Sequence, residues 1–219
     1  MSRLELSEAI QDYLKEIYKL QAENGRATTT RIARRMHVAP SSATAMLKKL
    51  SALGLAEHAR YRGVVLTDAG ERVALEVIRH HRLLEQYLAE TLGLSIDAVH
   101  AEADRLEHAL SEELEARIDS SLGFPTHDPH GDPIPDAALN LDQTRFRPLG
   151  DLDAGEKAVV RRVPDGDPEL LRYLSELSLV PGNRVEMLAT APFRGPLTVR
   201  VSGSERAISR ELADQIGVA

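Results

Sequence analysis

The residues most suited to chemistry are histidines and carboxylates between positions 81 and 108 of the 219-residue chain. Four of them are spaced at 0, +4, +7 and +8, which places them on one face if the segment is helical: His100, Asp104, Glu107 and His108. Upstream, His81 and Glu85 are also four positions apart. Burying imidazoles and carboxylates without partners is costly, and a divalent cation would compensate for that cost. The spacing therefore predicts a metal site, with a solvated polar helix face as the alternative.

Two further histidines, His127 and His130, are also separated by a ligand-like interval. They lie in residues 123–135 (GFPTHDPHGDPIP), a segment too rich in Pro and Gly to be helical. We therefore interpret both as turn or cap residues of a loop.

The N-terminal third has the pattern of three helices. Apolar residues at spacings of three and four predict an amphipathic helix over residues 6–22, which Asn24-Gly25 ends. A run of threonines caps a second helix over residues 28–36, and Pro40 opens a third that extends to residue 53. Two short helices joined by a tight turn are typical of a helix-turn-helix, whose second helix enters the major groove of DNA.

A hairpin is expected directly after the third helix. Residues 55–59 and 64–67 are short β-capable stretches that flank Arg60 and Arg62. A hairpin in this position is a wing, and arginines at its tip are well placed to contact phosphates or the minor groove. The segment therefore predicts a winged helix-turn-helix, with a small helical domain that binds no nucleic acid as the alternative.

The charge distribution favours the same interpretation. Residues 1–62 carry 11 Lys/Arg and 6 Asp/Glu, whereas residues 63–219 carry 16 and 28, for a net charge of −7. A basic N-terminal module on an acidic body is typical of a nucleic-acid-binding domain attached to another function. The chain has no cysteine and no apolar run of membrane-spanning length, so we expect a cytoplasmic protein with neither disulfides nor a membrane anchor.

Beyond the wing, longer helices give way to short strands. We expect a helix of about 25 residues from Thr67 and two more over residues 95–110 and 112–122. Several short β-like segments and one short helix follow residue 151, a pattern that suggests a small β-barrel. The expected fold is mainly α with a small β part, arranged as a winged helix-turn-helix at 1–70, a helical domain at 71–140, a linker at 141–150 and a C-terminal domain at 151–219.

Several motifs resemble the diphtheria-toxin-repressor/MntR family of metal-dependent transcriptional regulators. They occur in order along essentially the whole chain: DYL and IY within 12–18, VAPSS at 38–42, YRGVVLT at 61–67, HHRLLE at 80–85, H and DRLEH within 100–108, and GDPIP at 131–135. The resemblance implies a winged-helix DNA-binding domain, a helical dimerisation and metal-binding domain, and a C-terminal SH3-like barrel.

The resemblance also implies how the candidate ligands divide between two sites. The primary site falls on Asp12, Asp104, Glu107 and His108. The ancillary site falls on His81, Glu85 and His100, with Asp165 as the barrel residue that could complete it.

The donor types favour a hard cation. Where iron-sensing members of the family have Met and Cys, this chain has Asp12 and Asp104, which leaves oxygen atoms and imidazoles. We therefore expect Mn²⁺, with Fe²⁺ as the alternative. Lys15 stands where short manganese-dependent members have a second N-terminal carboxylate, and this argues against a closely spaced pair of ions.

The expected function is that of a homodimeric repressor of metal-uptake genes that binds a palindromic double-stranded DNA operator only when metal is bound. A metal that bridges Asp12 to the later ligands would tie the DNA-binding domain to the dimerisation domain. The residues expected to contact DNA are Thr28, Thr30, Pro40, Ser41, Ser42, Thr44, Lys48, Lys49, Arg60 and Arg62.

Two other classes of protein remain open from the residues alone. A winged-helix regulator of a small organic ligand would bind DNA regardless of chelators, and it gives no reason for the aligned carboxylates and imidazoles. A metalloenzyme would also use histidine and carboxylate ligands. However, the chain has no HExxH motif, and an enzyme would leave the basic winged module without a role.

Overall fold

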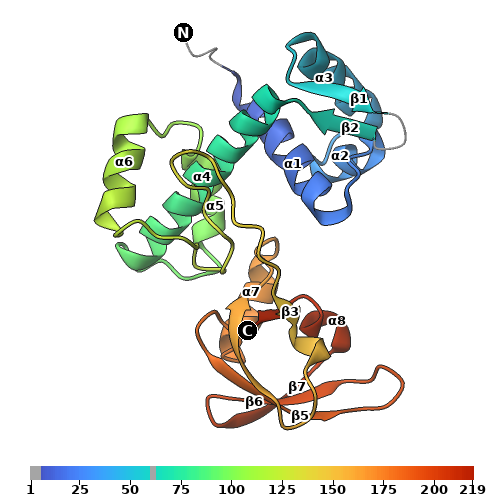
Figure 1. Ribbon diagram of the computed structural model, residues 1–219, viewed down its shortest axis with the longest axis vertical. Coiled ribbons are helices and arrows are strands. Elements are labelled where there is room, and N and C mark those ends of the chain that lie inside the picture. Colours follow the sequence, from blue (N-terminus) through green and yellow to red (C-terminus); the bar gives the residue numbers. More distant parts are fainter. Residues whose placement is uncertain (1–5, 60–62) are drawn as a thin grey trace. The chain divides into compact units, whose positions relative to one another are not determined.

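The N-terminal helices form where the apolar spacing predicts them. In a computed structural model, which describes residues 6–59 and 63–219, α1 spans Glu8–Asn24, α2 Thr29–Arg35 and α3 Pro40–Ala52 (Figure 1). Gly25 ends α1 with φ of 65°, the left-handed conformation that glycine adopts without strain. The Thr28 hydroxyl accepts a hydrogen bond from the Arg31 N–H and so caps α2 as expected.

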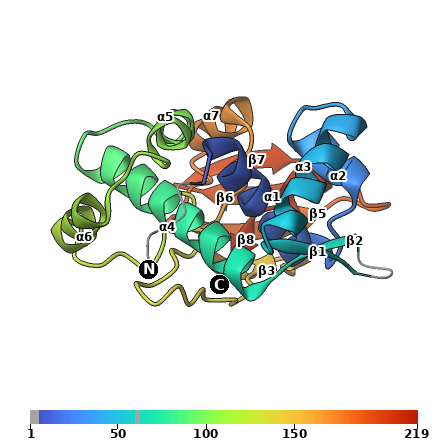
Figure 2. The same cartoon turned by 90° about the horizontal axis from the view of Figure 1, so that it is seen from above.

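A two-stranded hairpin follows α3 and completes the winged helix-turn-helix. β1 (Ala56–Ala59) pairs antiparallel with β2 (Gly63–Leu66), and α1 contacts both α2 and β2 (Figures 1 and 2). The core of this region is built from fully buried aliphatic side chains: Leu14, Ile17, Ile32 and Leu50. The expected tip residues Arg60 and Arg62 lie outside the described residues.

Three helices form the middle of the chain. α4 spans Asp68–Glu90, α5 Val99–Leu106 and α6 Glu112–Ser121. The α5 helix is shorter than the predicted 95–110, so the expectation that one helix carries all four ligand-type residues is wrong. Glu107 and His108 lie instead in the turn after α5, so the directions of their side chains do not follow the helical repeat. The chain folds as two compact units, and residues 107–110 belong with Met1–His81 and Pro135–Leu141 in the first.

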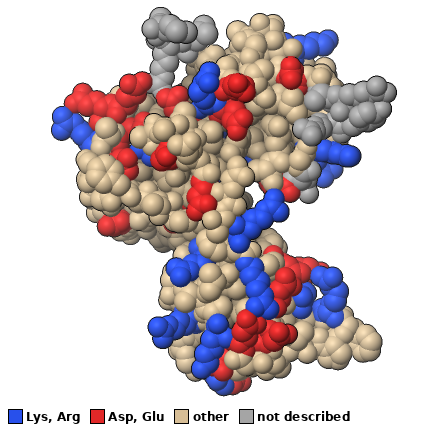
Figure 3. Space-filling view, viewed as in Figure 1, with Lys and Arg blue, Asp and Glu red and all other residues tan. Residues whose placement is uncertain are grey.

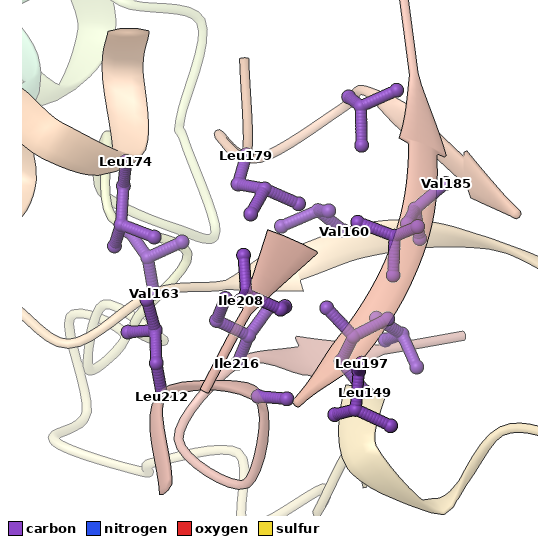
Figure 4. Close-up of a cluster of buried hydrophobic side chains, with 14 of the residues drawn as sticks. Leu149, Val160, Val163, Leu174, Leu179, Val185, Leu197, Ile208, Leu212 and Ile216 are labelled. Carbon is purple, nitrogen blue, oxygen red and sulfur yellow. The ribbon is translucent and has the colours of Figure 1, made fainter. Parts of the chain in front are cut away.

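The second unit contains a six-stranded sheet in the order β3-β8-β4-β5-β6-β7. Its elements are β3 (Arg147–Pro148), the 3-10 helix η1 (Leu149–Asp151), β4 (Lys157–Arg162), α7 (Pro168–Glu176), β5 (Arg184–Thr190), β6 (Leu197–Val201), β7 (Ser204–Ile208), α8 (Arg210–Ala213) and β8 (Gly217–Val218). Figure 4 shows its aliphatic core, in which Leu149, Val160 and Leu197 are fully buried. Because Leu149 lies in this core and Arg147 pairs with Val218, the sheet domain begins inside the segment 141–150 that was expected to be a linker.

In the described part of the chain, no helix is both long enough and apolar enough to cross a lipid bilayer.

Candidate metal centres and nucleic-acid interface

The first cluster of candidate ligands joins α1 to the turn after α5. His108 Nε2 lies 2.9 Å from Asp12 Oδ1 and 3.4 Å from Glu107 Oε1. The three residues offer ligand atoms that all lie within 4.8 Å of one another, close enough for one cation. Two carboxylates and one imidazole are donors that suit a divalent ion of intermediate or hard character. We call these three residues the Asp12 centre.

The pKa values of the two carboxylates of the Asp12 centre are shifted in opposite directions. Burial raises the pKa of Asp12 above its ordinary value and outweighs the favourable charges of His108 and Lys15. Burial would also raise the pKa of Glu107, but the hydrogen bond from His81 and the charge of Lys15 outweigh it and lower that pKa. Glu107 is therefore held as a carboxylate before any metal binds.

A lysine supplies the positive charge that keeps Glu107 ionised. Lys15 Nζ lies 2.6 Å from Glu107 Oε1, and the exposed fractions of the two side chains are only 8% and 1%. On the other side of the carboxylate, His81 Nδ1 lies 2.6 Å from Glu107 Oε2. Both oxygens of Glu107 thus already have partners, and an incoming ion would have to share one of them with Lys15 or His81.

We expect Lys15→Met to destabilise the metal-free protein by about 3 kcal/mol, because removing one partner of a buried ion pair leaves the other charge uncompensated. Mn²⁺ should recover most of this loss, since the ion supplies the missing positive charge. The measurement is urea unfolding of both proteins in chelator and in Mn²⁺. Lys19→Met is the matched control, because Lys19 forms only a partly exposed pair with Glu16 at 3.9 Å. A Lys15→Met protein as stable in chelator as the wild type would contradict this role.

The second cluster lies in the other unit and is buried throughout. Glu85 on α4 meets Asp128 and His130 from the loop after α6, and all three have ligand atoms within 4.8 Å of one another. His130 Nδ1 lies 3.6 Å from Glu85 Oε2 and 3.9 Å from Asp128 Oδ1. Among the described residues, neither His130 Nδ1 nor Asp128 Oδ2 has a hydrogen-bond partner, although both atoms are buried. Unsatisfied buried donors and acceptors of these types fit a bound cation. We call these three residues the His130 centre.

The backbone of the loop fixes the orientation of the His130 centre. Asp128 Oδ1 accepts hydrogen bonds from the backbone N–H groups of His130 and Asp132, both at 2.9 Å, whereas Oδ2 lies 3.7 Å from Arg82 Nε. His130 Nε2 lies 2.9 Å from the carbonyl oxygen of Ile96, so Nδ1 is the ring atom available as a ligand. Gly131, with φ of 88°, permits the close approach of β4, because a Cβ there would lie 1.8 Å from the Arg161 carbonyl oxygen.

Burial and the neighbouring charges shift the pKa values of Asp128 and His130 strongly. Burial, reinforced by the charge of Glu85, raises the pKa of Asp128 to about 8. Burial alone would lower the pKa of His130, but Glu85 and Asp128 outweigh it and raise that pKa to about 9. Without metal, both residues therefore keep their protons to a higher pH than usual, and a cation must displace those protons.

The structure brings some of the sequence-predicted ligands together in the expected sets and pairs others differently. Asp12, Glu107 and His108 converge as expected, and Glu85 Oε1 lies 2.9 Å from His100 Nδ1. Asp104, expected in the primary set, is half exposed and lies 3.7 Å from His100 Nε2, a residue of the ancillary set. His81, expected in the ancillary set, contacts Glu107 of the primary set.

The barrel residue expected to complete the ancillary site is Asp165. It is partly buried in the loop before α7. Within residues 6–59 and 63–219, it is not among the groups of ligand-type side chains that lie close enough to share an ion. Its role as a ligand therefore stays a prediction.

His130 lies in a turn, as interpreted, but its ring also belongs to a cluster of ligand-type side chains, and Asp128 was not predicted at all. His130 is fully buried because its ring points into the cluster while its backbone makes the turn. His127, by contrast, is partly exposed, and its Nδ1 lies 3.0 Å from the hydroxyl of the neighbouring Thr126. The Asp-x-His spacing of Asp128 and His130 was the signal that could have identified them as a pair of ligands.

The predicted DNA-contacting residues lie on the surface of the helix-turn-helix. Of that set, those in the described part of the chain are all at least partly exposed: Thr28, Thr30, Pro40, Ser41, Ser42, Thr44, Lys48 and Lys49. The Thr44 hydroxyl donates to the Pro40 carbonyl oxygen at 2.8 Å, so its methyl group is the part that remains for base contact. By contrast, acidic side chains gather over α6 (Figure 3), which carries Glu112, Glu113, Glu115 and Asp119. The two surfaces differ in charge, and only the helix-turn-helix suits a polyanion.

Comparisons with known proteins agree with this division. Residues 5–64 match the iron-dependent repressor N-terminal DNA-binding domain, residues 67–136 the iron-dependent repressor metal-binding and dimerisation domain, and residues 147–219 the FeoA domain. The chain is 32% identical to the iron-dependent repressor IdeR of Mycobacterium tuberculosis, over 98% of each chain. It is 33% identical to the diphtheria toxin repressor of Corynebacterium efficiens, over 84% of each.

Solved structures show the same similarity. A manganese-dependent transcriptional repressor in complex with manganese superposes with a TM-score of 0.85 and 39% identity, over 96% of this chain and 99% of the other. ScaR with bound Zn²⁺ gives a TM-score of 0.81 and 33% identity, over 96% and 98%. These relatives are repressors rather than enzymes, and the C-terminal sheet is the SH3-like part of the same architecture. The chain belongs to the diphtheria-toxin-repressor/MntR family of metal-dependent, DNA-binding transcriptional repressors.

Proposed function

We propose that this protein is a Mn²⁺-activated homodimeric repressor that binds a palindromic operator and controls metal-uptake genes. The observation that carries the proposal is the Asp12 centre, because it joins a carboxylate on α1 of the DNA-binding region to Glu107 and His108. All of its donors are oxygen or imidazole nitrogen, which favours Mn²⁺ over softer ions and leaves Fe²⁺ as the alternative.

The mechanism follows from what the ligands hold in place. Asp12, Glu107 and His108 would hold a divalent ion, whose positive charge would offset the repulsion between the two carboxylates. Asp12 is carried on α1, and α1 packs directly against α2 and β2, so fixing Asp12 fixes the base of the helix-turn-helix. With the helix-turn-helix held in this position, the α3 helices of the two subunits would have the spacing that a palindromic operator requires. Metal and operator then bind cooperatively, with a coupling of about 1–3 kcal/mol.

The His130 centre is a second candidate metal site with a separate role. It ties α4 to the loop at residues 128–132, where Arg162 of β4 also contacts Asp132 at 2.8 Å. A cation there would stabilise the second unit, whereas the Asp12 centre would control DNA binding. Both centres together give two ions per chain.

The proposal is tested by titrating operator binding with Mn²⁺, Fe²⁺ (under anaerobic conditions) and Zn²⁺, in parallel with chelated protein. Candidate operators would be selected from random duplexes in the presence of Mn²⁺. The proposal is supported if operator binding requires a metal ion. For each ion, the free concentration that gives half-maximal binding is divided by the concentration of that ion available in the cell, and this ratio should be lowest for Mn²⁺. DNA binding that is indifferent to chelator would instead point to regulation by an organic ligand.

Lys48→Ala is expected to weaken operator binding about equally across related operator sequences and to reduce the salt slope of log K by about 1, because the exposed Lys48 contacts phosphate rather than bases. The measurement is fluorescence anisotropy between about 50 and 200 mM salt. Lys157→Ala, which removes an exposed lysine from β4, is the matched control and should change neither affinity nor slope. An unchanged slope for Lys48→Ala would place α3 away from the DNA backbone.

A further inference from the structure

Gln11 connects the start of the described chain to the ring of His108. Its amide nitrogen Nε2 donates to the Leu6 carbonyl oxygen at 3.0 Å. Its amide oxygen Oε1 lies 2.9 Å from His108 Nδ1. Because the Leu6 carbonyl accepts from the nitrogen end of the amide, the oxygen end is the one that faces the imidazole.

An amide oxygen can only accept a hydrogen bond, and this determines which ring nitrogen of His108 carries a proton. The contact with Gln11 Oε1 requires an N–H at Nδ1. The other nitrogen, Nε2, is the atom that faces Asp12 Oδ1 at 2.9 Å and Glu107 Oε1 at 3.4 Å. An imidazole that binds a metal through Nε2 therefore matches this geometry, and one that binds through Nδ1 does not.

We propose that Gln11 is a positioning residue of the Asp12 centre, which fixes the His108 ring and its tautomer so that Nε2 is presented to the ion. The inference rests on the proposed function of that centre. Gln11 is not one of the three candidate ligands and acts through His108.

The side chain of His108 needs such a restraint. It lies in a turn beyond the end of α5, where the regular hydrogen bonding of the helix has stopped. A half-turn of the ring about the Cβ–Cγ bond would exchange Nδ1 with Cδ2 and Nε2 with Cε1, and would place a C–H against the ion. The Gln11 acceptor opposes that rotation, because in the rotated ring the Cδ2–H would face the amide oxygen and the hydrogen bond would be lost.

The test compares four variants with wild-type protein. Gln11→Leu keeps the approximate volume but removes the acceptor, and Gln11→Glu retains an acceptor in the same place. Gln21→Leu is the matched control on α1, since Gln21 Oε1 accepts instead from the Leu66 N–H. The Mn²⁺ affinity is read from the binding step that His108→Ala abolishes, which assigns that step to this centre.

Gln11→Leu should weaken that step by about 10–100-fold, the usual effect of removing an outer hydrogen bond to a histidine ligand. Gln11→Glu should restore affinity to within about threefold of wild type, because a carboxylate accepts the same hydrogen bond. Gln21→Leu should match the wild type. Loss of affinity in Gln11→Leu without rescue by Gln11→Glu would mean that the residue matters only for packing, and would overturn the proposal.

A spectroscopic readout is independent of affinity. In ¹⁵N-histidine-labelled protein loaded with ¹¹³Cd²⁺, His108 should show a protected Nδ1–H and a coupling between ¹¹³Cd and Nε2. In Gln11→Leu the Nδ1–H should exchange rapidly. Coupling to Nδ1 in the wild type would overturn the inference. If His108→Ala abolishes no binding step, the proposed Asp12 centre fails; if it does and Gln11→Leu binds like wild type, only the role of Gln11 fails.

Discussion

Replacing Asp12 with Ala is expected to weaken Mn²⁺-dependent operator binding by about 100-fold, near the upper end of the range for metal-coupled switches. The reason is the position of Asp12 on α1. Among the described residues of the Asp12 centre it is the one ligand that comes from the winged helix-turn-helix, whereas Glu107 and His108 come from the turn after α5. Without it, an ion still bound to Glu107 and His108 would no longer restrain the DNA-binding helices.

The Asp12→Ala protein should remain folded, because Asp12 is only half-buried and the apolar residues beside it are unchanged. Operator binding is measured by anisotropy over a range of free Mn²⁺, and unfolding is followed with and without the ion. The His130 centre should still give a Mn²⁺-dependent increase in the melting temperature, which separates the two roles. Glu8→Ala, an exposed substitution one turn earlier on α1, serves as the control. Undiminished Mn²⁺-induced operator binding by Asp12→Ala would refute the proposal that an ion at Asp12 restrains the DNA-binding helices.

The second large effect is expected from pH. Mn²⁺ affinity at the His130 centre should rise steeply from pH 6.5 to 8, by up to about 100-fold per unit, because two protons must leave before the cation binds. The pKa of Asp128 is raised to about 8 and that of His130 to about 9, so both residues carry their protons at pH 6.5 in the metal-free protein. Calorimetry in buffers of different ionisation enthalpy measures the number of protons released.

The same shifts predict the opposite trend for stability without metal. The pKa of His130 lies above its ordinary value of 6.5, so its contribution is fully present below pH 6.5 and is lost as pH rises through about 9. The pKa of Asp128 lies above its ordinary value of 3.8, so the folded state binds the extra proton and loses stability as pH rises toward about 8. The chelated protein should therefore unfold more easily at pH 8.5 than at pH 6.5, and Mn²⁺ should reverse that order.

Asp128→Asn isolates the cause of both pH trends. The amide oxygen can still accept from the His130 and Asp132 N–H groups, so the loop keeps its turn, but the titratable ligand oxygen is gone. The variant should release about one proton fewer on binding and bind Mn²⁺ at this centre more weakly, with a flatter stability profile. A wild-type affinity that does not change with pH would show that this cluster does not bind the ion.

Much of the architecture could be predicted from the sequence because its signals are local. The apolar spacing of α1, the threonine cap of α2 and Pro40 at the start of α3 act within one or two helical turns, and the structure confirms all three. The same kind of local signal gave a wrong prediction for the length of α5. The 0, +4, +7, +8 spacing suggested one continuous helix face, but the helix ends at Leu106.

The sequence by itself determined the kinds of ligand available, the basic helix-turn-helix and the order of the domains. Only the tertiary structure decided which ligands meet. It brought Glu107 and His108 to Asp12, placed Lys15 and Gln11 around them, and buried His130 against Glu85. The physical reason is that periodicity reports contacts within a few residues of the chain, whereas a metal centre depends on side chains that separate segments bring within hydrogen-bonding distance through packing.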